Sequence, residues 1–527
     1  MKTIIVGTGM AGLTAAAYLA KEKQDVLLLD KNDRIGGLLN TFEKDGFYFD
    51  AGPRAFVNSG MVKPILKELG VEWDFVKNTI SIGIEDKLVF VDSMDALDEY
   101  KEILLQLFHD NSQDIERIIE LIRKLSDYTK VLYQFDNPNF GDMTSDKKFV
   151  FFQLLPWLVK LMLTLRKFDR YKMPMEEAMA DLTDNQSLTD IMTQLFFRKT
   201  PTYFALGYFY VYLDYFYPKS GTVALPNLLH EKIVEGGGKI QLNRHIVEVI
   251  PAESRIIDDK GNSYQYDNLI WAADLKTLYR ITNLEGLDEN QVTPISSEAQ
   301  KILSSKGAES NFMMFIGVDR PLSYFREKGG EHMFYSPSRE GLGEINRSKR
   351  QDLLDNFGKK TKSEVFQWID DYCRLNSYEV SVPALRDPAL APEGKTGVMI
   401  SCLFDYNIVK KIEAASWHEE FKQRMETNII TLFADTIYKD FDKDILFKFS
   451  STPLTIEKVA GSSEGAIIGW TFEEQIPVEN NLQDIPKSVF TRIPDVYKAG
   501  QWAYAPSGVP IAMLTGWHAA QKIIKKN

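Results

Sequence analysis

A glycine-rich turn between two apolar runs at the start of the chain constrains the fold more than any other feature. Residues 2–6 read KTIIV, and they are followed by Gly7, Gly9 and Gly12 in the spacing G-x-G-x-x-G. An alanine-rich stretch and a second apolar run, DVLLLD, come next and end at Asp30. This order predicts a strand, a tight turn, a helix and a second strand. In that context the glycine pattern indicates dinucleotide binding, whereas the alternative is an ordinary α/β domain with a glycine-rich turn.

Each glycine of the turn has a distinct structural role in such a unit. Gly7 lets the backbone turn sharply, Gly9 leaves room for a pyrophosphate, and Gly12 lets the helix pack close to the strand. The phosphates then bind at the helix N-terminus, beside Met10 and Ala11. Free N–H groups and the helix dipole favour anions at that position.

The residues after the second apolar run extend this motif. Asp30 follows the last glycine by about 20 residues, as expected of the acid that binds a ribose, and Lys31 lies beside it. A second glycine pair comes next, and residues 46–50 read as a hairpin strand that leads into another turn. The residues assigned to the cofactor in this extension are Gly36, Gly37, Leu38, Gly52, Pro53 and Arg54.

The whole segment DKNDRIGGLLNTFEKDGFYFDAGPRAF resembles the two-glycine extension of the large FAD oxidoreductase family that includes amine oxidases, protoporphyrinogen oxidase and phytoene desaturases. Its phrase GFYFDAGP is most similar to the branch of phytoene desaturases, carotenoid isomerases and retinol saturases. That family usually has Glu at the ribose position, where this chain has Asp30. Both acids accept hydrogen bonds from ribose hydroxyls, so the resemblance implies FAD as the cofactor.

Two later stretches resemble further parts of the family's FAD domain. Residues 268–274, NLIWAAD, are similar to a strand end behind the dinucleotide, which implies a cofactor role for Ala272. The family also places a backbone group against the adenine at the position of Val247. The C-terminal segment resembles the family's closing motif, in which the last helix points N–H groups at the flavin N1–C2=O edge and stabilises the reduced flavin. Its residues are Gly500, Gln501, Gly508, Val509 and Pro510.

Length and composition bound the domain organisation. With 527 residues, 44% of them hydrophobic, the chain is long enough for two domains with large cores. The resemblance implies an α/β fold in which a Rossmann-type, amine-oxidase-like FAD-binding domain is interrupted by an inserted α+β substrate domain. We assign residues 1–80, 223–284 and 491–527 to the FAD-binding domain, and residues 81–222 and 285–490 to the substrate domain.

Charge and cysteine content disfavour several classes. The net charge of −12 argues against nucleic-acid binding, which needs a basic face. Cys373 and Cys402 lie far apart without metal-like spacing, so we expect two ordinary thiols in a reducing compartment and no metal site. The first strand begins at residue 2, so no signal peptide is expected, and no uninterrupted apolar run reaches about 20 residues. These features predict a cytoplasmic protein.

Residues 149–168, FVFFQLLPWLVKLMLTLRKF, form a very apolar stretch with basic residues at its ends and middle. One interpretation is a buried core helix, kinked at Pro156. The other is an interfacial helix that dips into a membrane, with Trp157 and lysines at the headgroup level. In the second case the protein is peripheral on the inner face of the membrane.

Residues 203–217, YFALGYFYVYLDYFY, are dense in aromatic side chains. They either fill a core or line a flat tunnel that suits a polyene. The Y-P-x-x-G that follows resembles a stretch that passes near the flavin in the family, and residues 464–470 resemble a stretch near the substrate. The substrate residues assigned here are Tyr215, Tyr217 and Trp470, and the candidates for a proton acceptor or donor are Asp214 and Lys219.

Together with the resemblance, these features predict an FAD-dependent oxidoreductase that acts on a long apolar isoprenoid, of the carotenoid desaturase, isomerase or saturase type. Hydride would pass between a C–H bond and flavin N5, while the protein supplies orientation and a dry tunnel. Two alternatives stay open. One is an amine oxidase or protoporphyrinogen oxidase with the same FAD motifs, and the other is a non-enzymatic prenyl-binding protein of the Rab GDP-dissociation-inhibitor type.

Overall fold

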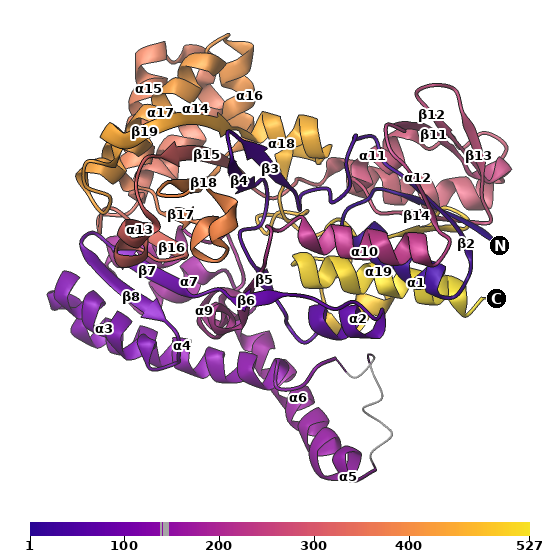
Figure 1. Ribbon diagram of the computed structural model, residues 1–527, viewed down its shortest axis with the longest axis horizontal. Helices are drawn as coiled ribbons and strands as arrows, with labels where there is room; N and C mark the ends of the chain where they lie inside the picture. Colours follow the sequence, from indigo (N-terminus) through magenta and orange to yellow (C-terminus); the bar gives the residue numbers. More distant parts are fainter. Residues whose placement is uncertain (138–139, 141–146, 527) are drawn as a thin grey trace.

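The computed structural model describes residues 1–137, 140 and 147–526 (Figure 1). Its first layer is a five-stranded parallel sheet whose strands come from three separate parts of the chain. In spatial order the strands are β10 (Lys239–Gln241), β2 (Asp25–Leu29), β1 (Lys2–Val6), β14 (Asn268–Trp271) and β20 (Val496–Lys498). They fall within the three segments assigned to the FAD-binding domain. The predicted strand, turn, helix and strand at the N-terminus are confirmed.

The register of this sheet brings the carboxyl ends of its strands to one edge. Val6 pairs with Leu29 on one side and with Trp271 on the other, and Trp271 pairs with Lys498. Ligands of open α/β sheets bind at such an edge. The residues that follow the strands meet there: the glycine turn after β1, Asp30, Ala272 and Ala499.

Both faces of the parallel sheet are covered. One face packs on three helices that lie side by side, α1 (Met10–Lys21), α10 (Ala224–Glu235) and α19 (Val509–Ile524). The other face packs on an antiparallel sheet and two helices, β11 (Ile246–Ile250), β12 (Arg255–Asp258), β13 (Ser263–Gln265), α11 (Leu275–Ile281) and α12 (Glu289–Ser304). Small residues let α1 and α19 approach closely, since a Cβ on Gly516 would lie 2.2 Å from the carbonyl oxygen of Ala11.

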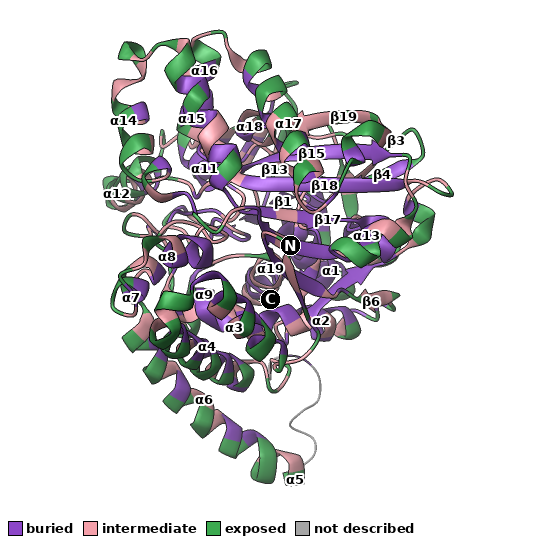
Figure 2. Ribbon diagram, turned by 90° about the vertical axis from the view of Figure 1, so that its left-hand side faces the viewer, coloured by how far each residue is buried: buried purple, intermediate pink, exposed green. Residues whose placement is uncertain are grey.

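The second layer is a seven-stranded mixed sheet. Its order is β19 (Ile445–Ser451), β15 (Ser310–Val318), β18 (Thr396–Phe404), β17 (Tyr378–Ser381), β16 (His332–Ser336), β7 (Ile80–Ile84) and β8 (Lys87–Val91). Its apolar outer face packs on α14 (Ser348–Asn356), α15 (Lys362–Leu375), α16 (Tyr406–Ala414) and α17 (His418–Asp435). Figure 2 shows its central strands β15, β17 and β18 as mostly buried, whereas the edge strand β19 is intermediate or exposed. The opposite face, which we call the inner face, carries Phe334, Glu379 and Ser401 in register across neighbouring strands.

Smaller elements connect the two layers. The predicted hairpin is confirmed as β3 (Thr41–Lys44) and β4 (Phe47–Asp50). A three-stranded sheet pairs β9 (Tyr215–Pro218) with β5 (Phe56–Val57) and β6 (Phe75–Lys77). The remaining α-helices of the body are α2 (Val62–Glu68), α3 (Ala96–Leu107), α4 (Ser112–Leu132), α7 (Met175–Ala180), α8 (Gln186–Thr193), α9 (Thr202–Val211), α13 (Leu322–Lys328) and α18 (Pro453–Ala460).

A long helical arm extends from the body of the molecule (Figure 1). It consists of α5 (Lys147–Phe149), a π-helical turn (Val150–Leu154), α6 (Leu155–Phe168) and a short 3₁₀ turn, and we call residues Lys147–Tyr171 the arm helix. Pro156 follows the π-helical turn, and the helix continues through it. A wider turn next to a proline is a common way to accommodate the missing N–H group.

The arm helix corrects two expectations. The core-helix interpretation is wrong, because Phe151 and Phe152 are 71% and 77% exposed. Figure 2 shows exposed residues along α5 and α6. Among the described residues the arm is also the one helix that is long and apolar enough to cross a membrane, by length and composition only, with 25 residues and a mean hydropathy of 1.5. Lysines such as Lys160 interrupt the apolar run in the sequence, but they do not interrupt the helix.

Candidate functional site

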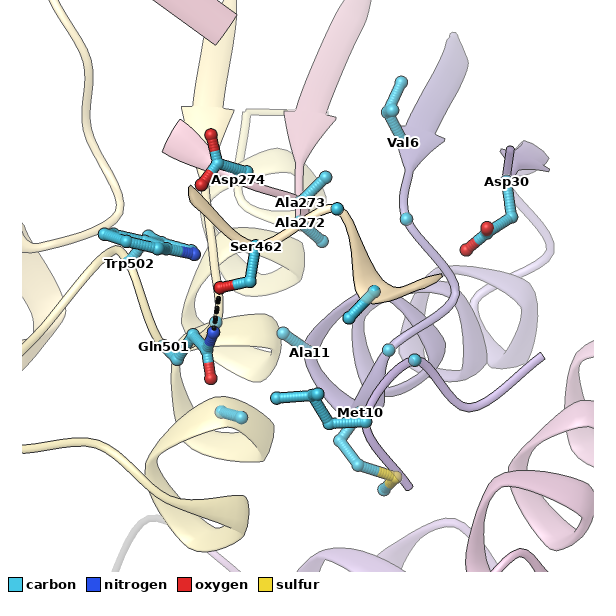
Figure 3. Close-up of a pocket in the computed structure, with 18 of the residues that line it drawn as sticks. Val6, Met10, Ala11, Asp30, Ala272, Ala273, Asp274, Ser462, Gln501 and Trp502 are labelled. Atoms are coloured by element: carbon cyan, nitrogen blue, oxygen red, sulfur yellow. Dashed lines mark hydrogen bonds between the residues drawn. The ribbon is translucent and has the colours of Figure 1, made fainter. Parts of the chain in front are cut away.

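A cavity lies at the carboxyl edge of the parallel sheet, next to the N-termini of α1 and α19 (Figure 3). Figure 3 shows Asp30 on one side of this cavity, Gln501 and Trp502 on the other, and Met10 and Ala11 between them. Most of the residues predicted for the cofactor line its wall: Gly7, Gly9, Met10, Ala11, Asp30, Lys31, Gly36, Gly37, Leu38, Pro53, Ala272, Gly500, Gln501, Gly508 and Val509. We call it the cofactor cavity.

The three glycines of the first turn contribute in different ways. Gly7 has a φ of +105°, and a Cβ there would lie 2.6 Å from the carbonyl oxygen of Ala272, so no larger residue fits. A Cβ on Gly12 would lie 1.9 Å from the carbonyl oxygen of Gly7, which explains the close packing of α1 on its strand. A Cβ on Gly9 would meet no atom within 4 Å, because this glycine borders the open cavity.

Two helix N-termini border the cofactor cavity without a side chain that caps them. α1 begins after Gly9 and α19 begins after Gly508, and neither helix has a capping side-chain hydrogen bond or an acidic residue in its first turn. First-turn N–H groups that no side chain satisfies attract anions, and the helix dipole adds to this attraction. The cavity wall at both helix N-termini therefore suits an anionic or electron-rich group.

Asp30 is held firmly at the end of β2. Its Oδ2 atom accepts hydrogen bonds from the backbone N (2.7 Å) and the Oγ1 (2.6 Å) of Thr8. Its Oδ1 atom accepts one from the backbone N of Asn32 at 2.9 Å. A carboxylate accepts about four hydrogen bonds, so Oδ1 retains capacity for a ribose hydroxyl. The shorter side chain of aspartate is thus fixed at the cavity wall.

Four other residues predicted for the cofactor lie, like Gly12, outside the cavity wall. A Cβ on Gly52 would lie 1.9 Å from the carbonyl oxygen of Leu38, so this glycine positions the second glycine turn. Arg54 is buried and its Nη2 donates to Ser401 Oγ at 2.7 Å, on the inner face of the mixed sheet. Pro510 lies in the first turn of α19, between Val509 and Ala512, which line the cavity.

Val247 is the fourth of these residues, and it is 43% exposed. A β-bulge interrupts the pairing of β11 between Ile246 and Glu248, which turns this position outward. The preceding residues Arg244, His245 and Ile246 line the cavity instead. Val247 itself does not line the cavity, so its contact with the adenine stays a prediction.

Several lining residues had little or no signal in the sequence. Asp274 caps α11 by accepting a bond from the backbone N of Thr277 (2.7 Å), and its Oδ2 accepts one from the backbone N of Ser463 (2.8 Å). Gln501 Nε2 donates to Ser462 Oγ at 3.3 Å, as Figure 3 shows. Of Asp274 and Ser462, only Asp274, at the end of the WAAD run, has a position that a sequence pattern indicates. The loop around Ser462 reaches the cavity wall only through the tertiary fold.

The two candidates for proton transfer lie in different surroundings. Burial raises the pKa of Asp214, although its Oδ2 atom accepts a bond from the backbone N of Ser59 at 2.8 Å. Lys219 lies at the surface, where its Nζ pairs with Asp74 at 2.7 Å. Neither side chain lines the cofactor cavity. The surface position of Lys219 does not suit a proton donor next to the cofactor.

None of the three predicted substrate residues lines the cofactor cavity, and each has different surroundings. Tyr217 is fully buried, donates to Asp50 Oδ2 at 2.7 Å and is covered by the guanidinium of Arg386, 3.9 Å from its ring. Trp470 is fully buried and packs edge-to-face on Trp502, a lining residue, with ring centroids 4.7 Å apart. Tyr215 shares a hydrogen bond of 2.8 Å with the hydroxyl of Tyr208. Trp470 thus packs behind a residue of the cavity wall, whereas Tyr215 and Tyr217 contact residues outside that wall.

The fold and the cavity define a dinucleotide-binding protein of the Rossmann type. The chain belongs to the family of flavin-containing amine oxidoreductases, whose sequence profile matches residues 10–524.

Known proteins resemble the chain over its full length. The 4,4'-diapophytoene desaturase (4,4'-diaponeurosporene-forming) of Staphylococcus aureus is 23% identical, over 100% of this chain and 99% of the relative. A putrescine oxidase redesigned in its cofactor binding has a TM-score of 0.60 at 14% identity, over 100% and 99% of the two chains. An oxidoreductase from Methanosarcina mazei has a TM-score of 0.58 at 16% identity, over 100% of both chains. The predicted fold class is confirmed.

The protein is an FAD-dependent oxidoreductase, as predicted, and the residues of the cavity fit FAD. The open space at Gly9 and the uncapped N-terminus of α1 suit the diphosphate. Asp30 suits a ribose, and the uncapped N-terminus of α19 suits an electron-rich ring edge. When bound, FAD supplies the redox chemistry, and the chain supplies binding, orientation and exclusion of water.

Proposed function

We propose that this oxidoreductase acts on a long apolar isoprenoid or polyene, by transfer of hydride between a C–H bond of the substrate and the flavin. The observation that carries the proposal is the exposed apolar surface of the arm helix. Its outward-facing residues are Phe151, Phe152, Leu155, Val159, Met162 and Leu163. Soluble proteins rarely expose such a patch unless it binds a membrane, a ligand or a partner. The likeness to a diapophytoene desaturase supports the same substrate class.

Aromatic side chains connect the arm helix to the interior. Phe168, at the end of α6, packs on Tyr203 of α9 with ring centroids 5.0 Å apart. Further along α9, Tyr208 contacts Phe204 (5.4 Å) and Tyr215 (6.3 Å). Flat aromatic faces pack well on an extended conjugated chain. A substrate that enters beside the arm would therefore meet aromatic surface along α9.

Basic residues at both ends of the arm helix support a peripheral position on a membrane. Lys147 and Lys148 begin the arm, and Arg166 and Lys167 lie in the last turn of α6. Trp157 anchors the arm to the body, since its Nε1 donates to the carbonyl oxygen of Val131 at 2.8 Å. An amphipathic helix with basic flanks binds at the interface of an anionic membrane. We therefore propose that the protein lies in the cytoplasm, peripheral on the inner face of the membrane.

The proposal is tested by the redox response of the flavin in the absence of oxygen. The FAD-loaded enzyme is mixed with liposomes that contain either a saturated-chain isoprenoid or its conjugated counterpart, in the oxidised and the dithionite-reduced state. We expect the visible flavin band to bleach with the first substrate or to return with the second. Putrescine serves as the comparison. Bleaching by putrescine, without a response to either isoprenoid, would contradict the proposal and favour an amine oxidase.

A further inference from the structure

Glu379 is a carboxylate inside the molecule that the cofactor cavity does not use. It lies on β17, a central strand with β16 on one side and β18 on the other. It occupies the inner face, in register with Phe334 and Ser401. Its side chain is still 29% exposed, although strands flank it on both sides. The carboxylate therefore faces accessible space on the inner face rather than packed core.

A chain of hydrogen bonds fixes the orientation of this carboxylate. Arg386 Nη1 donates to Asn78 Oδ1 at 2.6 Å, so the amide nitrogen of Asn78 is the atom that faces His332 Nδ1, at 3.3 Å. His332 Nδ1 then accepts, and its proton lies on Nε2. Nε2 donates to Glu379 Oε1 at 2.9 Å. His332 is buried, and burial lowers its pKa, so it is neutral at pH 7.

Glu379 itself is ionised. Burial raises its pKa, but the charge of Arg54, with Nη1 4.0 Å from Glu379 Oε2, and the bond from His332 outweigh this effect and lower the pKa to about 2. Among the described residues, Oε2 receives a hydrogen bond only from Ser401 Oγ, at a long 3.4 Å. A carboxylate oxygen accepts about two bonds, so Oε2 has capacity left for a donor that arrives from the accessible space.

The neighbouring hydroxyl groups do not fill this capacity. The ring of Tyr215 lies against His332, with centroids 5.8 Å apart, but its hydroxyl bonds to that of Tyr208. A bare hydrocarbon that filled the space would displace water from the carboxylate without donating a hydrogen bond in its place. An ionised group that loses its hydrogen-bond partners on burial weakens binding strongly.

We propose that Glu379 is a specificity-determining residue that accepts a hydrogen bond from a hydroxyl group of the substrate. This inference rests on the proposed function and narrows it: the substrate is an isoprenoid that carries an alcohol, not a bare hydrocarbon. The donor is neutral because the guanidinium of Arg54 already balances the charge of Glu379. An ammonium group at the same place would be repelled by Arg54.

The test compares three ligands that share one chain: geranylgeraniol, the hydrocarbon in which hydrogen replaces its hydroxyl, and the corresponding primary amine. Each is titrated into the FAD-loaded enzyme in detergent micelles, and the Kd is obtained from the quenching of tryptophan fluorescence, without turnover. A hydrogen bond to a charged group corresponds to a preference of about tenfold or more. We therefore expect the alcohol to bind about tenfold tighter than the hydrocarbon, and tighter than the amine.

Glu379→Gln keeps the shape but removes the charge, so the preference for the alcohol should fall below about threefold, since neutral hydrogen bonds are roughly half as strong. Glu331→Gln is the matched control. This carboxylate, next to His332 in the sequence, accepts a bond from the backbone N of Thr79 at 2.8 Å, and its loss should leave the preference unchanged. If Glu379→Gln fails to retain FAD, Glu379→Asp takes its place. Aspartate keeps the charge but holds the carboxylate farther from the substrate, so the preference for the alcohol should fall in the same way.

The outcomes separate this inference from the proposed function. Equal affinity for alcohol and hydrocarbon, or a preference that survives in the Glu379 variants, overturns the role of Glu379 and leaves an isoprenoid substrate in place. Tightest binding of the amine overturns the assignment of a neutral donor. If no ligand of the series binds, the inference fails together with the proposed function.

Discussion

The glycines of the first turn differ in whether they shape the fold or leave room for the ligand. Gly7 and Gly12 stand against backbone atoms, so a side chain at either position would distort the turn. Gly9 stands against open space, so a side chain there is compatible with the fold but occupies the place of the diphosphate. The two kinds of glycine therefore predict different defects.

We expect Gly9→Glu to fold and to lose FAD, because the new carboxylate would fill the space at the N-terminus of α1 and repel the diphosphate. The flavin-to-protein absorbance ratio of the purified variant should fall about tenfold or more, which corresponds to about 1.4 kcal/mol or more. Gly358→Glu is the control, since Gly358 is exposed and a Cβ there would also meet no atom within 4 Å. A Gly9→Glu protein that retains as much bound flavin as the wild type would contradict this account of the turn.

At the scale of elements, the arm helix and α19 each have a property that can be measured directly. The arm presents apolar side chains to solvent, and α19 carries a buried histidine behind its contact with the cofactor cavity. The first property concerns binding to a membrane, and the second concerns stability.

The double variant Phe151→Glu with Phe152→Glu should lose binding to liposomes that contain anionic lipid. Each buried phenylalanine contributes roughly 1.5–3 kcal/mol of transfer free energy, so the bound fraction in co-sedimentation should fall by at least about tenfold. Val234→Glu changes an exposed apolar residue of α10 and should bind like the wild type. Unchanged sedimentation of the folded double variant would show that the arm does not hold the protein on the membrane.

His518 of α19 should make the protein less stable in acid. Burial, with smaller contributions from Lys522 and Lys525, lowers the pKa of His518 from 6.5 to about 4. Between these values the unfolded chain binds a proton that the folded protein does not, so stability is lost as the pH falls from 6.5 towards 4. The loss attributable to this residue is on the order of 3 kcal/mol.

Urea unfolding at about pH 7 and about pH 4.5 measures this effect, and His518→Gln should reduce the difference between the two free energies of unfolding. His109→Gln is the control, because His109 is exposed. If His518→Gln shows the same pH dependence as the wild type, the buried imidazole does not cause the acid sensitivity.

At the scale of the whole molecule, the parts that could be predicted from the sequence are those that a local motif determines. The turn at Gly7, the acid at Asp30 and the helix after Gly508 lie in contiguous motifs, and the structure brings all three to one cavity. The inner face of the mixed sheet has no such motif. Its partners Arg54, His332 and Glu379 are separated by more than 40 residues and meet only through strand order and register.

The arm helix and Val247 show two further limits of sequence patterns. Whether an apolar helix is buried or exposed depends on what the rest of the chain packs against it, so its composition allowed both a core helix and an interfacial helix. The outward turn of Val247 depends on a bulge in the pairing of β11 with β12, which no short pattern in this strand indicates.

The most direct test of the central claim is the visible absorption spectrum of the protein purified with no cofactor added. The account predicts flavin bands at about one FAD per chain, because α1, α19 and Asp30 build one dinucleotide site. Structured bands of a co-purified polyene would support the isoprenoid substrate as well. A folded protein that shows no flavin bands, even after incubation with added FAD, would contradict the account.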